Sequence, residues 1–249
     1  MKTKQAGGSG PHQIQIALRS LKNVDWEKRR ILDIGCSNGY ITNEILKFTS
    51  AKEIIGIDIE ADRILKANKL KREAKENRLK FFKADSTDLS KFDDNSFDGI
   101  FSNMTFQQIS PENLPVALKE VKRLLKPGGL AIINFNQRKS DVTFEIQKLL
   151  QEKNATRFKK LSLKLFKDYA IKTGFSKVKC VARSDVYYHK SLDNLLGNSK
   201  DANWRFQNTK LNEKQIEEIW KKVKDIFRKR KTALGYKESW NMVFAQLAK

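Results

Sequence analysis

The sequence has few of the residues that build disulfide frameworks, metal centres or membrane spans. Among its 249 residues are two cysteines and two histidines. Two cysteines cannot form a disulfide framework, and two histidines exclude a histidine-rich metal centre, so we expect no metal site. No apolar run approaches the roughly 20 residues that cross a bilayer, so we expect no membrane span. The polar residues 1–11 lack the apolar stretch of a secretory signal, and we expect a cytoplasmic location.

Positive charge is abundant and unevenly distributed. The chain has 50 Lys and Arg against 29 Asp and Glu, a formal net charge of +21. Residues 1–136 carry a net charge of +6, and residues 137–249 carry the remaining +15. With 39% hydrophobic residues, including 15 Phe and 4 Trp, the chain is not a disordered basic protein. Such a field attracts anionic partners, although a lysine-rich solvated surface gives the same composition.

The first half of the chain alternates short apolar runs with helical patterns. Five such runs with helices between them, within about 110 residues, predict a doubly wound parallel sheet of the α/β class. The expected strands are 30–35, 53–59, 79–85, 97–103 and 130–135, and the expected helices are 40–48, 61–77 and 113–126.

The second half is less regular. Apolar residues recur every three or four positions over 212–234, which predicts an amphipathic helix, whereas 185–210 gives no clear pattern. Residues 141–152 and 162–173 are expected helices, and 178–183 and 239–247 are expected strands. The expected parts are a covering segment 1–27, a core 28–184, a helical insertion or lid 185–235, and a terminal strand of the core within 236–249.

A glycine-rich turn follows the first expected strand, where open α/β sheets bind ligands. Asp33 lies two residues before Gly35, and Gly39 follows four residues later. The dinucleotide fingerprint G-x-G-x-x-G is absent, because Ser37 stands at its second glycine. The Asp33 carboxylate would repel a pyrophosphate but suits a ligand with an ammonium group.

Acidic residues also close the next two expected strands. Asp58 lies 23 residues after Gly35, where an acid can accept hydrogen bonds from both ribose hydroxyls. Asp85 and Ser86 close the third strand and can meet the exocyclic amine of an adenine. The turn and these acids together indicate a nucleoside pocket without a phosphate site.

Five motifs occur in a recognisable order. They are Asp33-x-Gly35-x-x-x-Gly39, Gly56-Ile57-Asp58, Ala84-Asp85, Phe97-Asp98-Gly99-Ile100 and Leu124-Leu125-Lys126-Pro127-Gly128-Gly129. Over about residues 28–136 the chain thereby resembles class I S-adenosylmethionine-dependent methyltransferases. The resemblance implies a Rossmann-like sheet of seven strands, the last antiparallel, with S-adenosylmethionine as cofactor and S-adenosylhomocysteine as product. It implies cofactor-binding roles for Asp33, Gly35, Cys36, Ser37, Gly39, Asp58, Ile59, Asp85, Ser86 and Ser102.

The segment after the fourth expected strand usually reports the methyl acceptor in this family. It reads Ser102-Asn103-Met104-Thr105, not the Asn/Asp-Pro-Pro-aromatic sequence of enzymes that methylate nucleobase amines. Through Gln108 it resembles small-molecule carboxyl O-methyltransferases of the malonyl-carrier-protein and trans-aconitate type. Gln107 matches their glutamine, while Gln108 replaces their tryptophan. The expected substrate-contacting residues are Gln13, Asn103, Gln107 and Gln108.

A carboxylate acceptor would need little chemical help from the protein. It is already nucleophilic at pH 7, so attack on the sulfonium methyl requires no general base, and we assign no catalytic residue. Alignment of the reacting groups can supply roughly 7–11 kcal/mol.

The basic run over 221–231 leaves several readings open. Three interpretations fit these basic residues: a solvated helix face, a docking surface for an anionic small molecule or acyl carrier protein, or a contact for RNA phosphates. RNA is therefore the alternative acceptor, and the sequence does not predict the oligomeric state.

Overall fold

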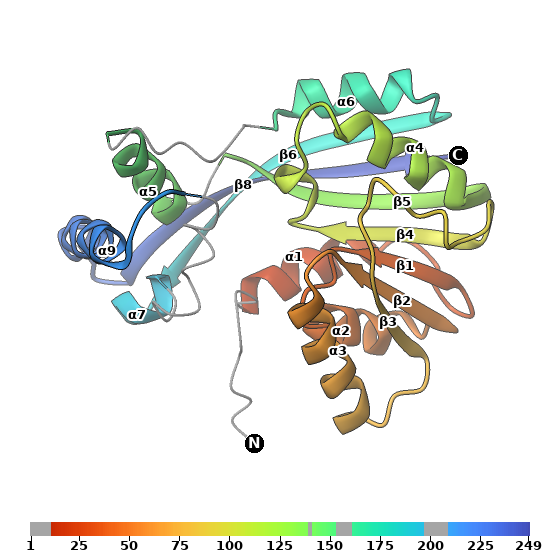
Figure 1. Ribbon diagram of the computed structural model, residues 1–249, viewed down its shortest axis with the longest axis horizontal. Helices are drawn as coiled ribbons and strands as arrows, with labels where there is room; N and C mark the ends of the chain where they lie inside the picture. Colours follow the sequence, from red (N-terminus) through yellow and green to blue (C-terminus); the bar gives the residue numbers. More distant parts are fainter. Residues whose placement is uncertain (1–10, 139–140, 153–160, 197–208) are drawn as a thin grey trace. The chain divides into compact units, whose positions relative to one another are not determined.

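The computed structural model describes residues 11–138, 141–152, 161–196 and 209–249 (Figure 1). The chain divides into two compact units. Of the described residues, unit 1 includes 136–138, 141–152, 183–196 and 209–242, and unit 2 comprises 11–135, 161–182 and 243–249. None of the described helices combines the length and the apolar character needed to cross a bilayer.

The sheet of unit 2 brings the ends of four parallel strands to one edge. Strand β1 (Arg30–Ile34) pairs in parallel with β2 (Glu53–Asp58) and β4 (Phe97–Asn103). β2 also pairs with β3 (Leu79–Lys83), and β4 with β5 (Leu125–Arg138). Because all five run in the same direction, the polar residues that close β1 to β4 lie along the same edge.

Helices cover both faces of this sheet (Figure 1). Helices α1 (Pro11–Leu21), α2 (Tyr40–Thr49) and α3 (Ala61–Glu73) lie on one face, and α4 (Leu114–Leu124) and α6 (Leu163–Lys172) on the other. Neighbouring residues of one strand point to opposite faces: Ile31 belongs to one apolar cluster and Leu32 to the other. Burial on both faces explains why these strands read as continuous apolar runs.

The expected number of seven strands is wrong. The described residues form a sheet of eight strands in the order β3-β2-β1-β4-β5-β8-β6, and β7 (Lys231–Thr232) pairs with β8 outside this order. β6 (Lys177–His189) and β8 (Gly235–Ala248) run in opposite directions, which makes the sheet mixed. Ser176 N donates to Ala248 O, and the Ser184 hydroxyl donates to Asn241 Oδ1. His189, at the end of β6, contacts Glu238, so residues later in β6 lie beside residues earlier in β8, as antiparallel strands do. Two residues in a hairpin leave no periodicity by which β7 could be predicted.

Unit 1 buries the apolar faces of three helices. Helices α5 (Asp141–Glu152), α7 (Leu192–Leu196) and α9 (Glu213–Arg228) contribute to one cluster. Asn212 caps α9 in a reciprocal capping box with Gln215. The predicted helix over 212–234 is too long, because the chain turns into the β7–β8 hairpin after Arg228 and Gly235 adopts a left-handed φ of 113°. The role of residues 185–235 as a lid stays a prediction.

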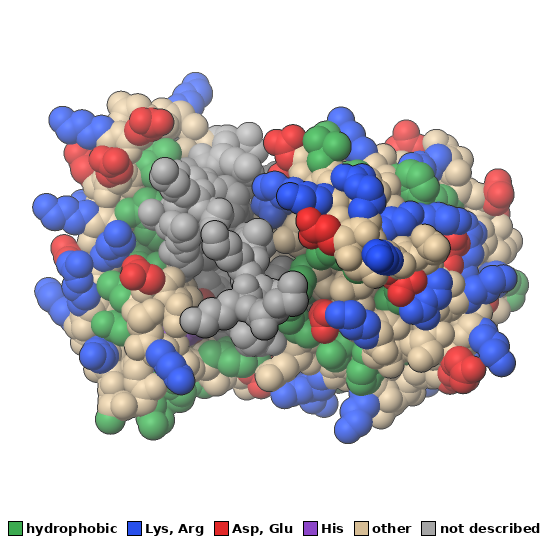
Figure 2. All heavy atoms as spheres, turned by 90° about the horizontal axis from the view of Figure 1, so that it is seen from below, with side chains coloured by type: hydrophobic (Ala, Val, Ile, Leu, Met, Phe, Trp, Pro, Cys, Tyr) green, Lys and Arg blue, Asp and Glu red, His purple; other side chains and the backbone are tan. Residues whose placement is uncertain are grey.

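On the face of the molecule that Figure 2 shows, lysine and arginine side chains alternate with acidic and hydrophobic side chains. Many of these cations form exposed pairs one helical turn apart, such as Lys164 with Asp168 and Arg228 with Asp225. Exposed pairs of this kind contribute little to folding stability. Solvation of the charged side chains therefore accounts for most of the basic surface. Only basic residues in an unusual arrangement need a separate explanation.

Candidate functional site

The turn after β1 is fixed against the end of β2. Gly35 N and Cys36 N both donate to Ile57 O, at 2.8 and 2.9 Å. Gly35 and Gly39 have φ of 79° and 75°, a conformation that L side chains rarely adopt. A Cβ on Gly39 would also lie 2.7 Å from the ring of Phe81. The two glycines are thus needed where the sequence pattern put them.

Asp33 is a buried carboxylate at the end of β1, only 3% exposed. The Thr42 hydroxyl, in the first turn of α2, donates to its Oδ2 at 2.6 Å. Burial raises the pKa of Asp33 from 3.8 to about 7; the hydrogen bond from Thr42 counteracts this, and the charge of Asp58 adds to it. A carboxylate held in this state favours a cationic ligand group, whose charge would stabilise its ionised form.

Asp58 is oriented by the backbone on both sides. Its Oδ2 accepts from Ser37 N at 2.9 Å and its Oδ1 from Glu60 N at 3.0 Å. Ser37 itself has a left-handed φ of 51°, and its hydroxyl accepts from Arg63 Nη1 at 3.0 Å. The serine therefore fits the tight turn, supported from α3. Beside Asp58, the apolar side chain of Ile59 is 60% exposed, as a residue that packs on an aromatic base would be.

Asp85 begins an exposed loop that α4 anchors. Its Oδ1 accepts from Thr87 N and the Thr87 hydroxyl, at 2.9 and 2.8 Å, and Ser86 is half-buried beside it.

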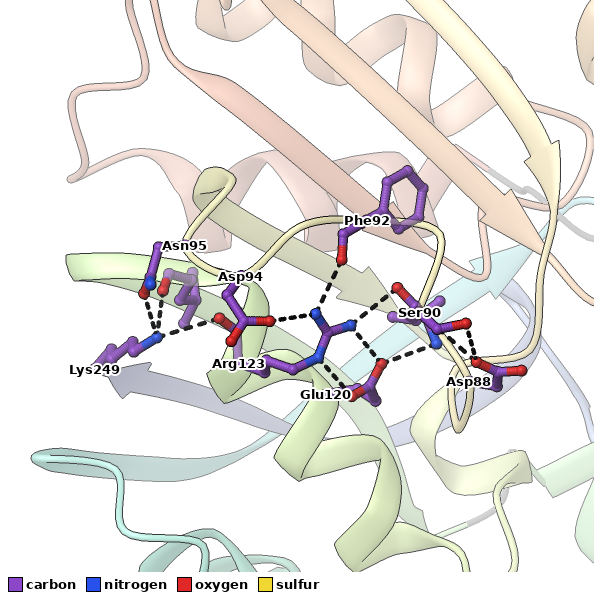
Figure 3. A network of polar contacts seen from close by, with 10 residues as sticks. Asp88, Ser90, Phe92, Asp94, Asn95, Glu120, Arg123 and Lys249 are labelled. Carbon is purple, nitrogen blue, oxygen red and sulfur yellow. Dashed lines mark hydrogen bonds and ion pairs between the residues drawn. The ribbon is translucent and has the colours of Figure 1, made fainter.

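Further along this loop, the Arg123 guanidinium donates to Leu89 O and Phe92 O, both at 2.9 Å, and pairs with Asp94 and Glu120 (Figure 3). The hydrogen bonds from Arg123 hold the pKa of Glu120 below its usual range. One side chain thus fixes the loop that follows Asp85.

The turn after β4 packs directly on the turn after β1. The buried Ser102 hydroxyl donates to Ile34 O at 2.8 Å and links β4 to β1. Met104 has a left-handed φ of 62°, and its N–H donates to Asn134 O at 2.8 Å. This conformation brings Thr105 over Gly35, where a Cβ would lie 1.9 Å from the threonine Oγ1. The two turns therefore share one packed contact at the edge of the sheet.

Two amides lie side by side on β4 and β5. Asn134 is fully buried, and its Nδ2 donates to Ser20 Oγ at 2.9 Å and toward Asn103 Oδ1 at 3.4 Å. Asn103 Nδ2 is buried and has no acceptor among the described residues. Gln107, in the 3-10 turn η1 (Phe106–Gln108), is half-buried with its Nε2 3.9 Å from Met104 Sδ, and Gln108 is exposed. The amide of Asn103 thus keeps a donor to offer.

The structure brings most of the predicted cofactor residues to one edge of the sheet, on or beside the ends of β1, β2, β3 and β4. The Cys36 side chain packs in the apolar core, so only its backbone is left to bind a ligand. Gln13 lies in α1, but its side chain is outside the described residues. Five contributors escaped the sequence patterns: Thr42, Arg63, Thr105, Arg123 and Asn134. Thr42 and Asn134 carried a signal, because each is a polar residue at an apolar position of its helix or strand.

A family model described as "Methyltransferase domain" matches residues 31–129. These residues include the turn after β1, Asp58, Asp85 and the turn after β4. Residues 31–129, less than half of the chain, therefore match a methyltransferase domain. The described residues fit S-adenosylmethionine: a buried acid suited to a cationic ligand group, a fixed acid for a ribose, and glycines at which a Cβ would clash. The specific contact made by each residue stays a prediction.

Curated relatives resemble part of the chain. It is 35% identical over 105 residues to a sterol 24-C-methyltransferase of Aspergillus fumigatus, covering 42% of this chain and 27% of that protein. It is 30% identical over 118 residues to a fatty-acid O-methyltransferase of Mycolicibacterium smegmatis, covering 47% and 41%. The chain thus matches less than half of each relative's length.

A solved structure shares the fold over the whole chain. It is the Haemonchus contortus phosphoethanolamine N-methyltransferase 2 in complex with S-adenosyl-L-methionine, at a TM-score of 0.63 and 18% identity. The match covers 100% of this chain and 54% of that one. The likeness supports the fold and leaves the acceptor open.

Proposed function

We propose that the protein is a cytoplasmic methyltransferase that methylates a carboxylate of a small or carrier-bound acid. When bound, S-adenosylmethionine supplies a methyl group activated by a cationic sulfonium. In this proposal Asp33 and the backbone of residues 35–39 hold the amino-acid part of the cofactor. Asp58 and Ile59 hold the ribose and one face of the adenine, and Asp85 with Ser86 meets the adenine edge.

The free donor of Asn103 is the observation that carries the choice of acceptor. Its Nδ2 is buried without an acceptor among the described residues, and its Oδ1 faces the amide of Asn134, which Ser20 holds in turn. A buried donor that finds no acceptor is unfavourable by about 1–3 kcal/mol. A carboxylate oxygen would accept from it. Because an amide cannot protonate the carboxylate, the acceptor would stay nucleophilic while it is oriented.

Two further observations support an anionic acceptor. Residues 137–249 carry a net charge of +15, which attracts acids from solution. One relative is named as a fatty-acid O-methyltransferase, whose acceptor is a carboxylate. Because another relative is named as a sterol 24-C-methyltransferase, the experiment must also detect methylation of acceptors other than carboxylates.

The decisive experiment is a transfer assay with the methyl group of S-adenosylmethionine tritiated. Dicarboxylic acids, fatty acids, acylated carrier protein and total RNA are supplied in parallel. A carboxyl methyl ester hydrolyses in mild alkali and releases volatile methanol, whereas methyl groups on nitrogen or carbon stay in the product. We expect volatile label from one of the acids, and the Asp58→Ala protein serves as the blank.

Each alternative gives a different pattern of label. Alkali-stable label in RNA would replace the carboxylate proposal with the RNA alternative. Alkali-stable label in a small molecule would keep the methyltransferase activity but reject the carboxylate. No cofactor binding by calorimetry would reject the methyltransferase assignment itself.

A further inference from the structure

A hairpin in unit 1 presents an exposed leucine on a fixed turn. β7 and β8 are joined by Ala233 and Leu234, with Thr232 paired to Gly235. The Thr232 hydroxyl donates to Gly235 O at 2.8 Å and braces the turn. Leu234 is 71% exposed, more than any other large hydrophobic side chain of the described residues. A rigid turn that holds a leucine in water is unfavourable unless another surface covers it.

Three lysines without carboxylate partners lie close to this leucine in the sequence. Residues 228–237 contain five Lys or Arg and no Asp or Glu. Arg228 and Arg230 are paired, with Asp225 and Glu145 respectively. No ion pair engages the exposed Lys229, Lys231 or Lys237 within the part of the chain that the structure describes. Lys231 Nζ lies 5.9 Å from the centre of the Tyr236 ring, and no carboxylate of the described residues neutralises any of these three lysines.

The neighbouring strand end adds to this charge. The backbone of Gly235 lies against His189 O and the Cα of Lys190, which places Lys190 beside the turn. Glu238, the nearest acid on β8, has only 5% of its side chain exposed and pairs with His189 at 2.9 Å. Asp193 in α7, which follows Lys190 closely in the sequence, is an exposed acid. The end of the hairpin thus combines one apolar side chain with an excess of lysine.

We propose that this hairpin docks on an anionic phospholipid surface. In this mode Leu234 enters the interface between headgroups and acyl chains, and Lys190, Lys229, Lys231 and Lys237 lie among the phosphates. Lysines next to a membrane each add to binding, and an inserted apolar side chain supplies the second signal that peripheral attachment needs. RNA would be bound by the lysines but would leave the leucine in water, which is why the membrane is the better match. The inference does not depend on which acceptor is methylated.

The test is sedimentation of the full-length protein with vesicles of equimolar phosphatidylcholine and phosphatidylserine. We expect binding to these vesicles, no binding to pure phosphatidylcholine, and release at high salt. Leu234→Ser should weaken binding several-fold, and Lys229→Ser with Lys231→Ser at least tenfold. Leu65→Ser, at a leucine 67% exposed in α3, and Lys52→Ser with Lys66→Ser are the matched controls. They should bind as the unmodified protein does.

The outcomes separate the possible occupants of the hairpin. Equal losses in the Leu234 and Leu65 variants would overturn the proposal, as would binding that ignores phosphatidylserine. RNA binding without vesicle binding would also overturn it. Self-association that Leu234→Ser abolishes, with vesicles unbound, would assign the hairpin to a second copy of the chain instead. All substituted positions are exposed, and a thermal melt confirms that each variant is folded.

Discussion

The Thr42 hydroxyl lies 2.6 Å from the Asp33 carboxylate and offsets only part of the unfavourable effect of burying that acid. The pKa of Asp33 is still raised from 3.8 to about 7, so the folded protein keeps a proton there that the unfolded chain releases. The stability of the ligand-free protein should therefore fall as pH rises from about 4 to about 7 and level off above.

The Asp33→Asn substitution should remove this pH-dependent loss of folding stability. The amide oxygen still accepts from Thr42 but carries no charge, so the variant should be more stable than the unmodified protein at about pH 8 by a few kcal/mol, at most roughly 4. Below about pH 4, where both proteins are uncharged at this position, the difference should vanish. Urea unfolding across this pH range measures it, and a gain of equal size at every pH would contradict the assignment.

Cofactor affinity should depend on pH through the same carboxylate. A cationic ligand beside Asp33 favours the ionised form, so binding below about pH 7 should release a proton, and affinity should rise up to that pH and then stay constant. Calorimetry of S-adenosylmethionine binding in two buffers of different ionisation enthalpy counts that proton. The Asp33→Asn protein should bind weakly with no proton release. Proton release that persists in this variant would point to another group.

Asp58→Ala should weaken cofactor binding at least tenfold, because it removes a fixed, charged acceptor. Asp62→Ala, at an exposed acid in the first turn of α3, is the matched control and should bind normally. Since Ser37 N and Glu60 N lose their acceptor, a thermal melt separates a local loss of binding from unfolding. Unchanged affinity in a folded Asp58→Ala protein would remove Asp58 from the cofactor site.

Gly35→Ala should destabilise the protein by about 1–3 kcal/mol, because an alanine is strained at φ 79° and its Cβ would overlap Thr105. Adding Thr105→Ala removes the overlap but not the backbone strain, so it should restore part of the stability. Unfolding curves of the single and double variants give the coupling between the two turns. Full recovery would show that the left-handed backbone carries no strain.

Arg123→Gln should release the loop that follows Asp85. The glutamine cannot reach Leu89 O, Phe92 O, Asp94 and Glu120 together, and we expect a loss of about 2 kcal/mol in stability. The KM for the cofactor should rise more than kcat falls, since the loop begins at Asp85, the acid that we propose to meet the adenine. Arg72→Gln, on the exposed side of α3, is the control. An unchanged KM would limit Arg123 to a structural role.

Sequence patterns predicted the parallel half of the sheet because its strands are buried on both faces and end at turns with distinctive residues. The same patterns located Asp33, Asp58 and Asp85, which close those strands. They could not locate Thr105, since its contact with Gly35 depends on the left-handed backbone of Met104. They also missed Arg123, which acts across 31 to 34 residues through backbone carbonyl groups that no side-chain pattern reports.

The second half was harder to predict for physical reasons. The amphipathic face that defines α9 ends at Phe227, but Leu234 has the same spacing and extended the apparent helix. The helix ends at Arg228 with Lys229 as its C-cap, and Leu234 lies in the hairpin turn that follows, with 71% of the residue exposed. A hydrophobic residue placed on a surface breaks the rule by which periodicity predicts burial.

The position of β8 between β5 and β6 has a consequence for how the chain is made. β6 is synthesised about 50 residues before β8 but pairs with the sheet only through it. During translation β6 therefore has no strand to pair with until β8 is synthesised. Strands β1 to β5 can already pair with one another, and only β5 still lacks a neighbour, which is β8. We expect an early folding intermediate that contains β1 to β5. In the final folding step β8 inserts between β5 and β6, which are both synthesised before it.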